Sequence, residues 1–147
     1  MWADKEVVAH MSGVPSTHEQ SWSRLLRYAG HWQLLGFGYW VVQSKADGDF
    51  LGEVGLADYH RDTDPTLDGR PEAGWVLRTC AHGKGYATEA AESAIQVGFE
   101  KGLSEIIAFA ELGNRPSLRV LKKLGMTESG RITYKTLPMR LFCLQAP

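Results

Sequence analysis

The sequence has few cysteines, no long apolar run and no excess of charge of either sign. Two cysteines among 147 residues, Cys80 and Cys143, are too few for a disulfide framework and indicate free thiols in a reducing compartment. No apolar stretch approaches the length of a membrane span, and the N-terminus lacks the pattern of a secretion signal. A net charge of -1 argues against bulk electrostatic binding to nucleic acid or to an anionic membrane. We therefore expect a cytoplasmic protein.

What is present is typical of a folded domain. Hydrophobic residues make up 44% of the chain and charged residues 22%, a composition found in globular rather than disordered proteins. A length of 147 residues suits one domain with a substantial core. No internal repeat or low-complexity segment divides the chain. We therefore predict a single domain.

The first third of the chain predicts helical structure. Residues 6–10 are interpreted as the tail of a helix. Residues 16–20 are typical of a helix start, with Glu19 or Gln20 placed to close a capping box. Four side chains then share one apolar helical face: Trp22, Leu25, Leu26 and Ala29. Gly30 is a natural end for this helix.

Strand character follows. Residues 37–43 are rich in aromatic and β-branched side chains, residues 46–49 are typical of a hairpin turn, and residues 50–56 form the returning strand. Residues 60–71 are polar and predict a surface loop. Residues 71–77 predict a third strand.

The second half of the chain predicts a βαβ unit. A helix after residue 86 presents small side chains on one face and ends at Lys101-Gly102; residues 104–111 then form an apolar run that suits a strand buried on both faces. The third strand and this strand should be parallel. Pro116 opens another helix, and residues 126–131 and 133–144 predict two closing strands. Pro138 within the last strand indicates an edge or a bulge.

The turn at residues 81–87 carries the strongest functional signal. Gly83 and Gly85 can take backbone conformations that other residues resist, and they leave no side chain in the way of a ligand. The free N–H groups of the turn and of the following helix start should point at one spot, a candidate phosphate site. The turn is not a Walker loop, because no Gly-Lys-Ser/Thr follows a first glycine at the required distance. It is not a dinucleotide fingerprint either, because Thr88 stands where the third glycine belongs. A plain strand-to-helix connection remains the alternative.

Three motifs stand in order along the chain: Gly83-Lys84-Gly85-Tyr86-Ala87-Thr88-Glu89-Ala90, Asn114-Arg115-Pro116-Ser117, and Lys123-Leu124-Gly125-Met126. Together with the hairpin and the third strand, this series resembles the GNAT superfamily of acyl-CoA-dependent N-acyltransferases. It looks most like the Rim-type branch, named for enzymes that acetylate the N-terminal amine of ribosomal proteins. The resemblance covers residues 16–144. It implies an α+β fold whose mixed, mostly antiparallel central sheet has a splayed parallel strand pair and is flanked by helices.

The resemblance also implies how the chain is organised. One acyltransferase domain should occupy residues 1–147. The family usually has a strand and the start of a helix before the position that matches residues 1–4, so either the start of this sequence is misplaced or truncated, or the sheet lacks its first edge strand. Such an edge leaves unpaired backbone groups that a partner chain could cover, and a homodimer is one arrangement that would do so.

Acetyl-CoA is the co-substrate that the resemblance implies, and no metal is expected. The pyrophosphate would lie on the backbone of residues 81–87, and the pantetheine arm between the third strand and the strand that ends at Ala110 and Glu111. The implied acetyl-CoA contacts are Val76, Leu77, Arg78, His82, Gly83, Lys84, Gly85, Tyr86, Ala87, Asn114 and Ser117. Cys80 stands where the family usually has Gln or Arg, so Arg78 or Lys84 would replace that contact.

The implied reaction is direct attack of an amine on the thioester, and it needs a base and a proton donor. Glu72 is the first candidate for the base, Glu111 the second and His60 the third; a solvated surface charge is the alternative for each. Ser117 is the candidate donor to the leaving thiolate, unless it only caps the helix. Tyr134 is the alternative donor.

Other residues are given structural roles. We expect Cys80 to be a buried, inert thiol and His82 to be a solvated loop residue. The tryptophans are expected in the core, with Trp32 as an alternative wall of the acceptor pocket; these are Trp22, Trp32, Trp40 and Trp75. Loops 10–16 and 60–71 would form the acceptor pocket. A non-catalytic CoA-binding domain of the same fold is the rival reading, and the amine itself is left open.

Overall fold

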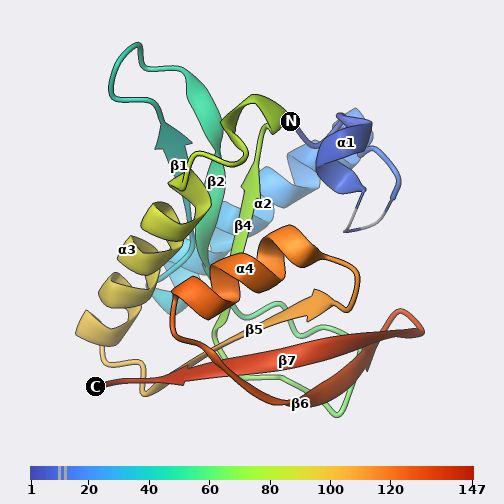
Figure 1. Cartoon of the computed structure of the whole chain (residues 1–147), viewed down its shortest axis with the longest axis vertical. Helices are drawn as coiled ribbons and strands as arrows, with labels where there is room; N and C mark the ends of the chain where they lie inside the picture. Colours follow the sequence, from blue (N-terminus) through green and yellow to red (C-terminus); the bar gives the residue numbers. More distant parts are fainter. Residues whose placement is uncertain (10, 12) are drawn as a thin grey trace.

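The computed structural model describes residues 1–9, 11 and 13–147, which form a seven-stranded mixed sheet with helices on both faces (Figure 1). The helical elements are α1 (Lys5–Val8), α2 (His18–Leu35), the 3-10 turn Thr79–Ala81, α3 (Tyr86–Glu100) and α4 (Arg115–Lys123). The strands are β1 (Tyr39–Gln43), β2 (Phe50–Ala57), β3 (Thr63–Asp64), β4 (Glu72–Leu77), β5 (Glu105–Glu111), β6 (Thr127–Tyr134) and β7 (Leu137–Gln145). None of the helices in these ranges is long and apolar enough to cross a membrane.

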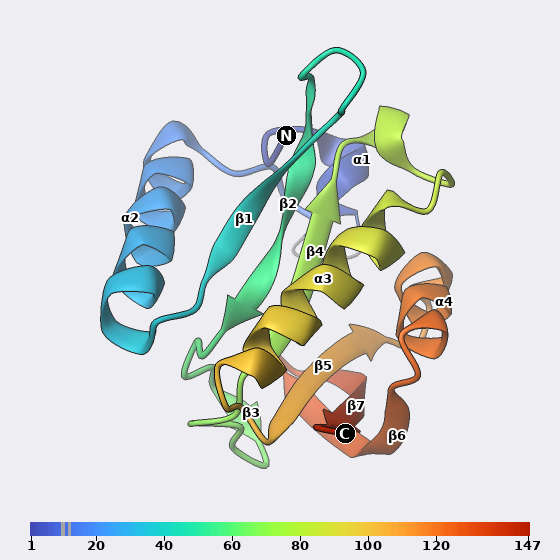
Figure 2. The ribbon, with the colours of Figure 1, turned by 90° about the vertical axis from the view of Figure 1, so that its left-hand side faces the viewer.

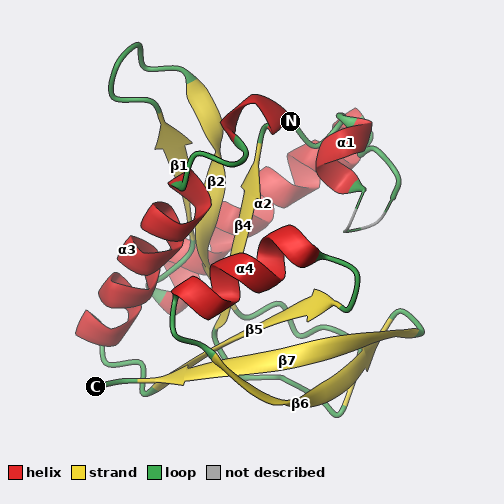
Figure 3. Cartoon of the chain, viewed as in Figure 1, coloured by secondary structure: helices red, strands yellow, loops and turns green. Residues whose placement is uncertain are grey.

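The sheet runs in the order β1-β2-β4-β5-β7-β6-β3. All neighbours are antiparallel except β4 and β5, so the predicted α+β class, the hairpin and the parallel pair are confirmed. Helix α2 covers one face of the β1-β2-β4 half, and α3 lies on the opposite face (Figure 2). Helix α4 lies beside α3, over the junction of the two halves of the sheet (Figure 3). The elements thus follow one another in the predicted order, with the short strand β3 added.

Strands β4 and β5 are paired at one position and then diverge. Glu72 opposite Ile107 is their one register pair, held by the amide of Ile107, which donates to the Pro71 carbonyl at 2.8 Å. Beyond that pair β4 runs toward α1 and β5 turns toward the start of α4, as Figure 2 shows. The splay leaves the β5-facing edge of β4 without a strand partner over most of its length.

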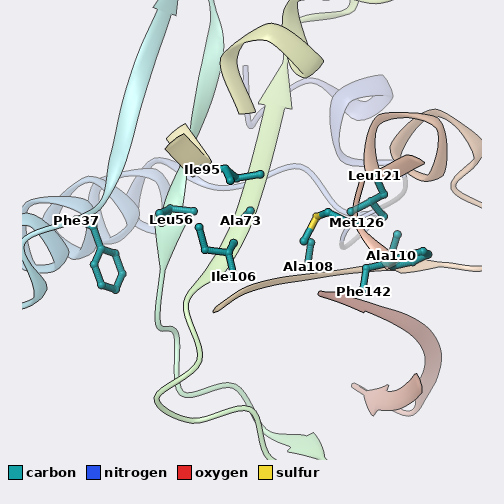
Figure 4. Packing of buried hydrophobic residues seen from close by; sticks show 10 residues of the cluster. All are labelled: Phe37, Leu56, Ala73, Ile95, Ile106, Ala108, Ala110, Leu121, Met126 and Phe142. Atoms are coloured by element: carbon teal, nitrogen blue, oxygen red, sulfur yellow. The ribbon is translucent and has the colours of Figure 1, made fainter. Parts of the chain in front are cut away.

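The main core lies between the sheet and helices α3 and α4 (Figure 4). The buried face of α3 consists of Ala91, Ala94, Ile95 and Gly98, as its small-residue spacing predicts. Gly98 shows why small residues are needed, because a Cβ at this position would lie 2.5 Å from Leu56 Cδ1 on β2. Leu121 of α4 is fully buried against the same cluster. Helix α3 can therefore pack this closely against β2 because Gly98 has no side chain.

The apolar face of α2 is exposed, so the expectation that Trp22 is a core residue is wrong. Trp22, Leu25 and Leu26 are 56%, 56% and 54% exposed. The face turned to the sheet is polar: Tyr28 donates a short hydrogen bond to Glu53, and His31 Nε2 lies 3.1 Å from the Asp58 carbonyl oxygen. Hydrophobic spacing finds the helix correctly, but side-chain hydrogen bonds decide which face meets the sheet.

Several element ends differ from prediction. Helix α2 begins with a complete capping box between Thr17 and Gln20, as expected, but runs through Gly30 and ends at Gly36, whose φ of 74° suits glycine. Burial of His31, one residue past Gly30, offsets the modest cost of a glycine inside a helix. The loop at residues 60–71 contains β3, paired with β6. The helix tail predicted at residues 6–10 corresponds to α1 (Lys5–Val8). Residue 10 of the predicted range lies outside the described residues.

The two closing strands meet at residues 135–136 instead of at residue 132. Ile132 is buried and pairs with Met139, so its side chain continues β6 into the core. Pro138 lies next to this turn, opposite Thr133, and the β5 ladder on the other side of β7 starts only at Met139. Pro138 is therefore at a local edge, as a proline without an N–H requires.

Candidate active site

A cleft of about 500 Å³ opens between the end of β4, the start of α3 and helices α1 and α4. Most of the residues predicted to contact acetyl-CoA line this cleft: Val76, Leu77, His82, Gly83, Gly85, Tyr86, Ala87, Asn114 and Ser117. Arg78 and Lys84 are exposed and do not line it. The cleft is large enough for an extended cofactor and therefore for the predicted co-substrate.

Free amide groups converge at the start of α3. Gly83 and Gly85 adopt left-handed φ angles of 74° and 88°, and Gly85 is the N-cap of the helix, with no side-chain cap. Within the described residues, no hydrogen-bond acceptor faces the amides of residues 83–87. Those donors and the positive end of the helix dipole suit a phosphate group.

Helix α4 offers a contrast. Its N-cap Asn114 accepts from the Ser117 amide at 3.1 Å through its side-chain oxygen, and the Leu118 amide donates to the Asn114 carbonyl. Pro116 has no N–H at all. Because its first amides are already satisfied, α4 is a poor anion site. The two helix starts that face the cleft therefore differ, and only α3 keeps its donors free for a phosphate.

The alternation of β4 determines which amides face the splay. The Arg78 amide donates to the Leu51 carbonyl of β2 at 2.8 Å. Since strand amides alternate between the two edges, the amides of Trp75 and Leu77 face the gap toward β5, and that of Val76 faces β2. The gap-facing amides lie where a thioester carbonyl in the cleft could accept a hydrogen bond.

Ser117 and Asn114 lie where two pockets meet. Capping is done by Asn114, so the Ser117 hydroxyl has no hydrogen-bond partner among the described residues. Asn114 keeps its side-chain NH₂ group free to donate, since only its oxygen is used. Both residues, with Trp75 and Val76, also line a second pocket of about 360 Å³. A reacting group at this junction is accessible from both sides.

The second pocket contains the first candidate base. Both carboxylate oxygens of Glu72 accept from Arg61, at 2.8 and 3.0 Å, and Arg61 also donates to the Tyr134 hydroxyl at 3.2 Å. Burial lowers the pKa of Arg61, but the hydrogen bonds and charge of Glu72 outweigh it and hold that pKa above its usual value. Glu72 is thus a paired carboxylate that must give up an ion pair to accept a proton.

The second candidate, Glu111, is differently placed. It is half-buried at the end of β5 and lines the second pocket, and its carboxylate makes no hydrogen bond or ion pair within the described chain. His60 lies outside the pocket and pairs with Asp58 and Asp68 at 3.2 and 3.5 Å. Of the three predicted bases, Glu111 alone lines the second pocket with a side chain that has no partner among the described residues.

Aromatic side chains make up much of the second pocket. Tyr28 and Tyr39 stack at 4.6 Å, and burial raises the pKa of both phenols and of Tyr59. These three hydroxyls therefore stay protonated at neutral pH. Tyr134, the alternative proton donor, lines the same pocket. The pocket wall comes from α2 and the strands; of the loops predicted to form it, residues 60–71 contribute Arg61 and residues 10–16 contribute Met11 among those described.

Some predictions of side-chain environment are wrong. Cys80 is exposed, because the 3-10 turn that carries it lies on the surface. His82 is exposed in a turn, as expected, and its ring Nε2 lies 3.0 Å from the Leu77 carbonyl oxygen, a contact that holds the turn against β4. Trp32 lines neither pocket; its indole N–H donates to the Tyr39 carbonyl.

Sequence reasoning missed basic residues in both pockets. Arg119 and Lys123 of α4 line the larger cleft, and Arg24 and Arg27 of α2 line the smaller one. The four-residue spacing of Arg119 and Lys123 places them on one helical face, a signal that could have found them. Among the described residues, no group of three His, Cys, Asp or Glu side chains could hold a metal ion.

A protein-family model described as an acetyltransferase (GNAT) domain matches residues 1–127. The chain belongs to this family. Among curated relatives of this GNAT chain, protein YkkB of Bacillus subtilis is 30% identical over 108 residues, which is 73% of this chain and 60% of YkkB. The chain thus spans less than two thirds of that relative's length.

Solved GNAT structures have the same fold. The acetyltransferase of Bacillus anthracis is 24% identical with a TM-score of 0.77, over 98% of this chain and 84% of that one. The yncA protein of Salmonella typhimurium, solved with its cofactor acetyl-CoA, is 22% identical with a TM-score of 0.74, over 100% of this chain and 92% of that one. At such identities the likeness shows the fold alone.

Proposed function

We propose that this chain transfers an acetyl group from acetyl-CoA to a primary amine by direct attack in a ternary complex. The observation that carries the proposal is the meeting of two pockets at Val76, Asn114 and Ser117. One pocket has free phosphate-binding amides at its far end, and the other has a free carboxylate. Two substrates that enter from opposite sides would meet at the junction, as direct transfer requires.

The residues present fit acetyl-CoA. The amides of residues 83–87 would hold the pyrophosphate, helped by the positive charges of Arg119 and Lys123 at the cleft wall. The Asn114 side-chain NH₂ group would donate to the pantetheine arm. When bound, acetyl-CoA supplies an activated acetyl group and a thiolate leaving group.

Groups of this chain would stabilise the charge that develops in the reaction and would transfer the protons. The gap-facing amides of Leu77 and Trp75 would hold the negative charge that develops on the carbonyl oxygen. Glu111 would take the proton from the attacking amine, because its carboxylate has no partner to give up. Ser117, whose hydroxyl is free, would donate to the leaving sulfur, and Tyr134 is the alternative donor.

Glu72 would have a different part in this scheme. Its bidentate pair with Arg61 holds the guanidinium against the Tyr134 hydroxyl and shapes the acceptor pocket. It would still act as a base through a water molecule if Arg61 moved away. Exchange of Glu111 or Glu72 for Gln distinguishes these roles: we expect Glu111→Gln to lower kcat about 100-fold and Glu72→Gln to affect mainly KM for the amine.

The test is an acceptor screen with acetyl-CoA that follows thiol release over a panel of amino acids, peptides, small amines and aminoglycosides. Turnover of at least one amine, lost in Glu111→Gln with CoA binding unchanged, supports the proposal. Tight CoA binding without turnover of any amine would instead favour the non-catalytic CoA-binding domain. The Rim-type branch and a cytoplasmic location rest on the sequence motifs and the free thiols, and belong to the same proposal.

A further inference from the structure

The acceptor pocket has an excess of positive charge. Of the described residues, four cations and two carboxylates line it: Arg24, Arg27, Arg61, Lys135, Glu72 and Glu111. Arg61 and Glu72 pair with each other, which leaves three cations against the single carboxylate that the proposed function assigns to the amine. A pocket that receives only an uncharged or cationic amine would have no use for this excess.

Arg24 is held in place while part of its guanidinium lacks an acceptor. Its guanidinium carbon lies 3.6 Å from the centre of the Trp2 ring, and Trp2 is itself fixed by an indole N–H donated to Glu53 at 2.7 Å. Arg24 Nη2 donates to the Ser16 hydroxyl at 3.2 Å. Arg24 Nη1 is shielded from solvent and has no partner in the described part of the chain. Such a donor is costly unless an acceptor arrives.

Arg27 lies on the same face of α2, three residues further along. Its guanidinium lies 5.2 Å from the centre of the Tyr59 ring, and it makes no ion pair within residues 1–9, 11 and 13–147. The guanidinium of Arg61 also lies near this ring, 4.2 Å from its centre. Arg27 is therefore positioned by an aromatic ring while its charge is unopposed. Guanidinium groups in this state are the usual binders of carboxylates, which they hold through two parallel hydrogen bonds.

We propose that the acceptor is a small amine that also carries a carboxylate, such as a free α-amino acid, and that Arg24 and Arg27 bind this carboxylate. The inference rests on the proposed function. The arginines come from α2, whereas Glu111 and Ser117 come from the end of β5 and the start of α4. The carboxylate of an amino acid would therefore meet the arginines, and its amine would meet Glu111. A volume of about 360 Å³ suits such a molecule.

The experiment compares each α-amino acid with its α-carboxamide as acceptor. The carboxamide is the weaker base, so more of its amine is neutral at pH 7, and chemistry alone favours it. We expect kcat/KM at least tenfold higher for the acid of the preferred side chain. Arg27→Gln should lower kcat/KM for the acid at least tenfold and bring the ratio of acid to amide close to one. Arg131→Gln, an exposed arginine of β6 outside both pockets, is the control and should keep the ratio.

The outcomes separate the two proposals. Equal turnover of acid and amide, equal turnover of the polycation tobramycin, or a ratio that survives in Arg27→Gln overturns the carboxylate site and leaves the proposed function standing. Absence of turnover with every amine overturns the proposed function. Binding then still tests the inference, because Trp2 and Trp75 line the pocket and report by fluorescence. Quenching by the acid in the presence of CoA, absent for the amide and lost in Arg27→Gln, supports the site; equal quenching refutes it.

Discussion

Exchange of Gly85 for Glu should weaken CoA binding about 30-fold. Gly85 is the uncapped N-cap of α3, and no atom lies within 4 Å of the position where a Cβ would be, so the new side chain has room beside the free amides. Two unit charges about 4 Å apart near a protein surface interact by about 4 kcal/mol. The turn is exposed on one side, so we take about half of this interaction energy, ~2 kcal/mol, as the repulsion between the introduced carboxylate and the phosphate. This repulsion raises the Kd for CoA about 30-fold.

The substitution also strains the backbone, and a second glycine controls for that. Gly102 has a φ of 90° against 88° at Gly85, equally open space around its Cβ position, and lies at the opposite end of the same helix. A left-handed conformation costs a non-glycine residue about 1–2 kcal/mol. Gly85→Glu and Gly102→Glu should therefore both lower Tm, and Gly102→Glu by more, because a carboxylate is favoured at the start of a helix and disfavoured at its end. Only the first should affect CoA.

Calorimetric titration with CoA, together with thermal unfolding of the free proteins, measures both effects. The charge effect should shrink as salt is raised, because exposed charges are screened. Gly85→Ala, which adds the strain without the charge, should bind CoA within about threefold of the unchanged protein. A Gly85→Glu protein that binds CoA normally, or a Gly102→Glu protein that loses it equally, would refute the assignment of the phosphate to this helix start.

Three further outcomes concern the acceptor side. Gly74→Ala places a Cβ 2.1 Å from the buried, stacked Tyr39 hydroxyl, so urea unfolding should show a loss of about 2 kcal/mol that Tyr39→Phe partly restores; an unaltered midpoint contradicts this. Arg61→Ala and Glu72→Ala, made singly and together, should show a coupling of about 2 kcal/mol in unfolding, and additive losses would deny the pair an energetic role. The raised pKa values of Tyr28, Tyr39 and Tyr59 favour the folded state below the ordinary tyrosine pKa of about 10, so stability should fall as pH rises above it, less steeply in Tyr28→Phe.

The sequence predicts the geometry of the turn before α3 well because its signals are local. Gly83 and Gly85 are two residues apart in a turn, and glycine permits the left-handed backbone conformations that both adopt. The βαβ unit follows from the order of strand, helix and buried strand. Its two strands are parallel because a helix that crosses over the sheet joins strands of the same direction. A phosphate site made of backbone amides needs no contact between distant residues. Its prediction therefore survives without any knowledge of the tertiary structure.

The acceptor side is less predictable because distant residues make it. Arg61 meets Glu72 from eleven positions away and Tyr134 from 73 positions away, and no spacing rule links them. Helix α2 shows the same limit. Its apolar stripe is the stronger periodic signal, whereas the face turned to the sheet is the polar one, with Tyr28 and His31 bonded to β2 and to the Asp58 carbonyl. Periodicity counts hydrophobic residues, but a face that lines a polar pocket is selected for hydrogen bonds.

The splay of β4 from β5 links the two sides. Had the strands stayed paired, the gap-facing amides of Trp75 and Leu77 would be bound to β5 carbonyls, and Glu111 at the end of β5 would lie beside β4 instead of facing a pocket. Because pairing stops after Glu72, β4 keeps free donors, and the start of α4 brings Ser117 to the same gap. The loss of a few strand hydrogen bonds thus produces one junction with donors for a developing negative charge, a free hydroxyl and a free carboxylate. Substitutions that close the gap should abolish transfer even where neither substrate is touched.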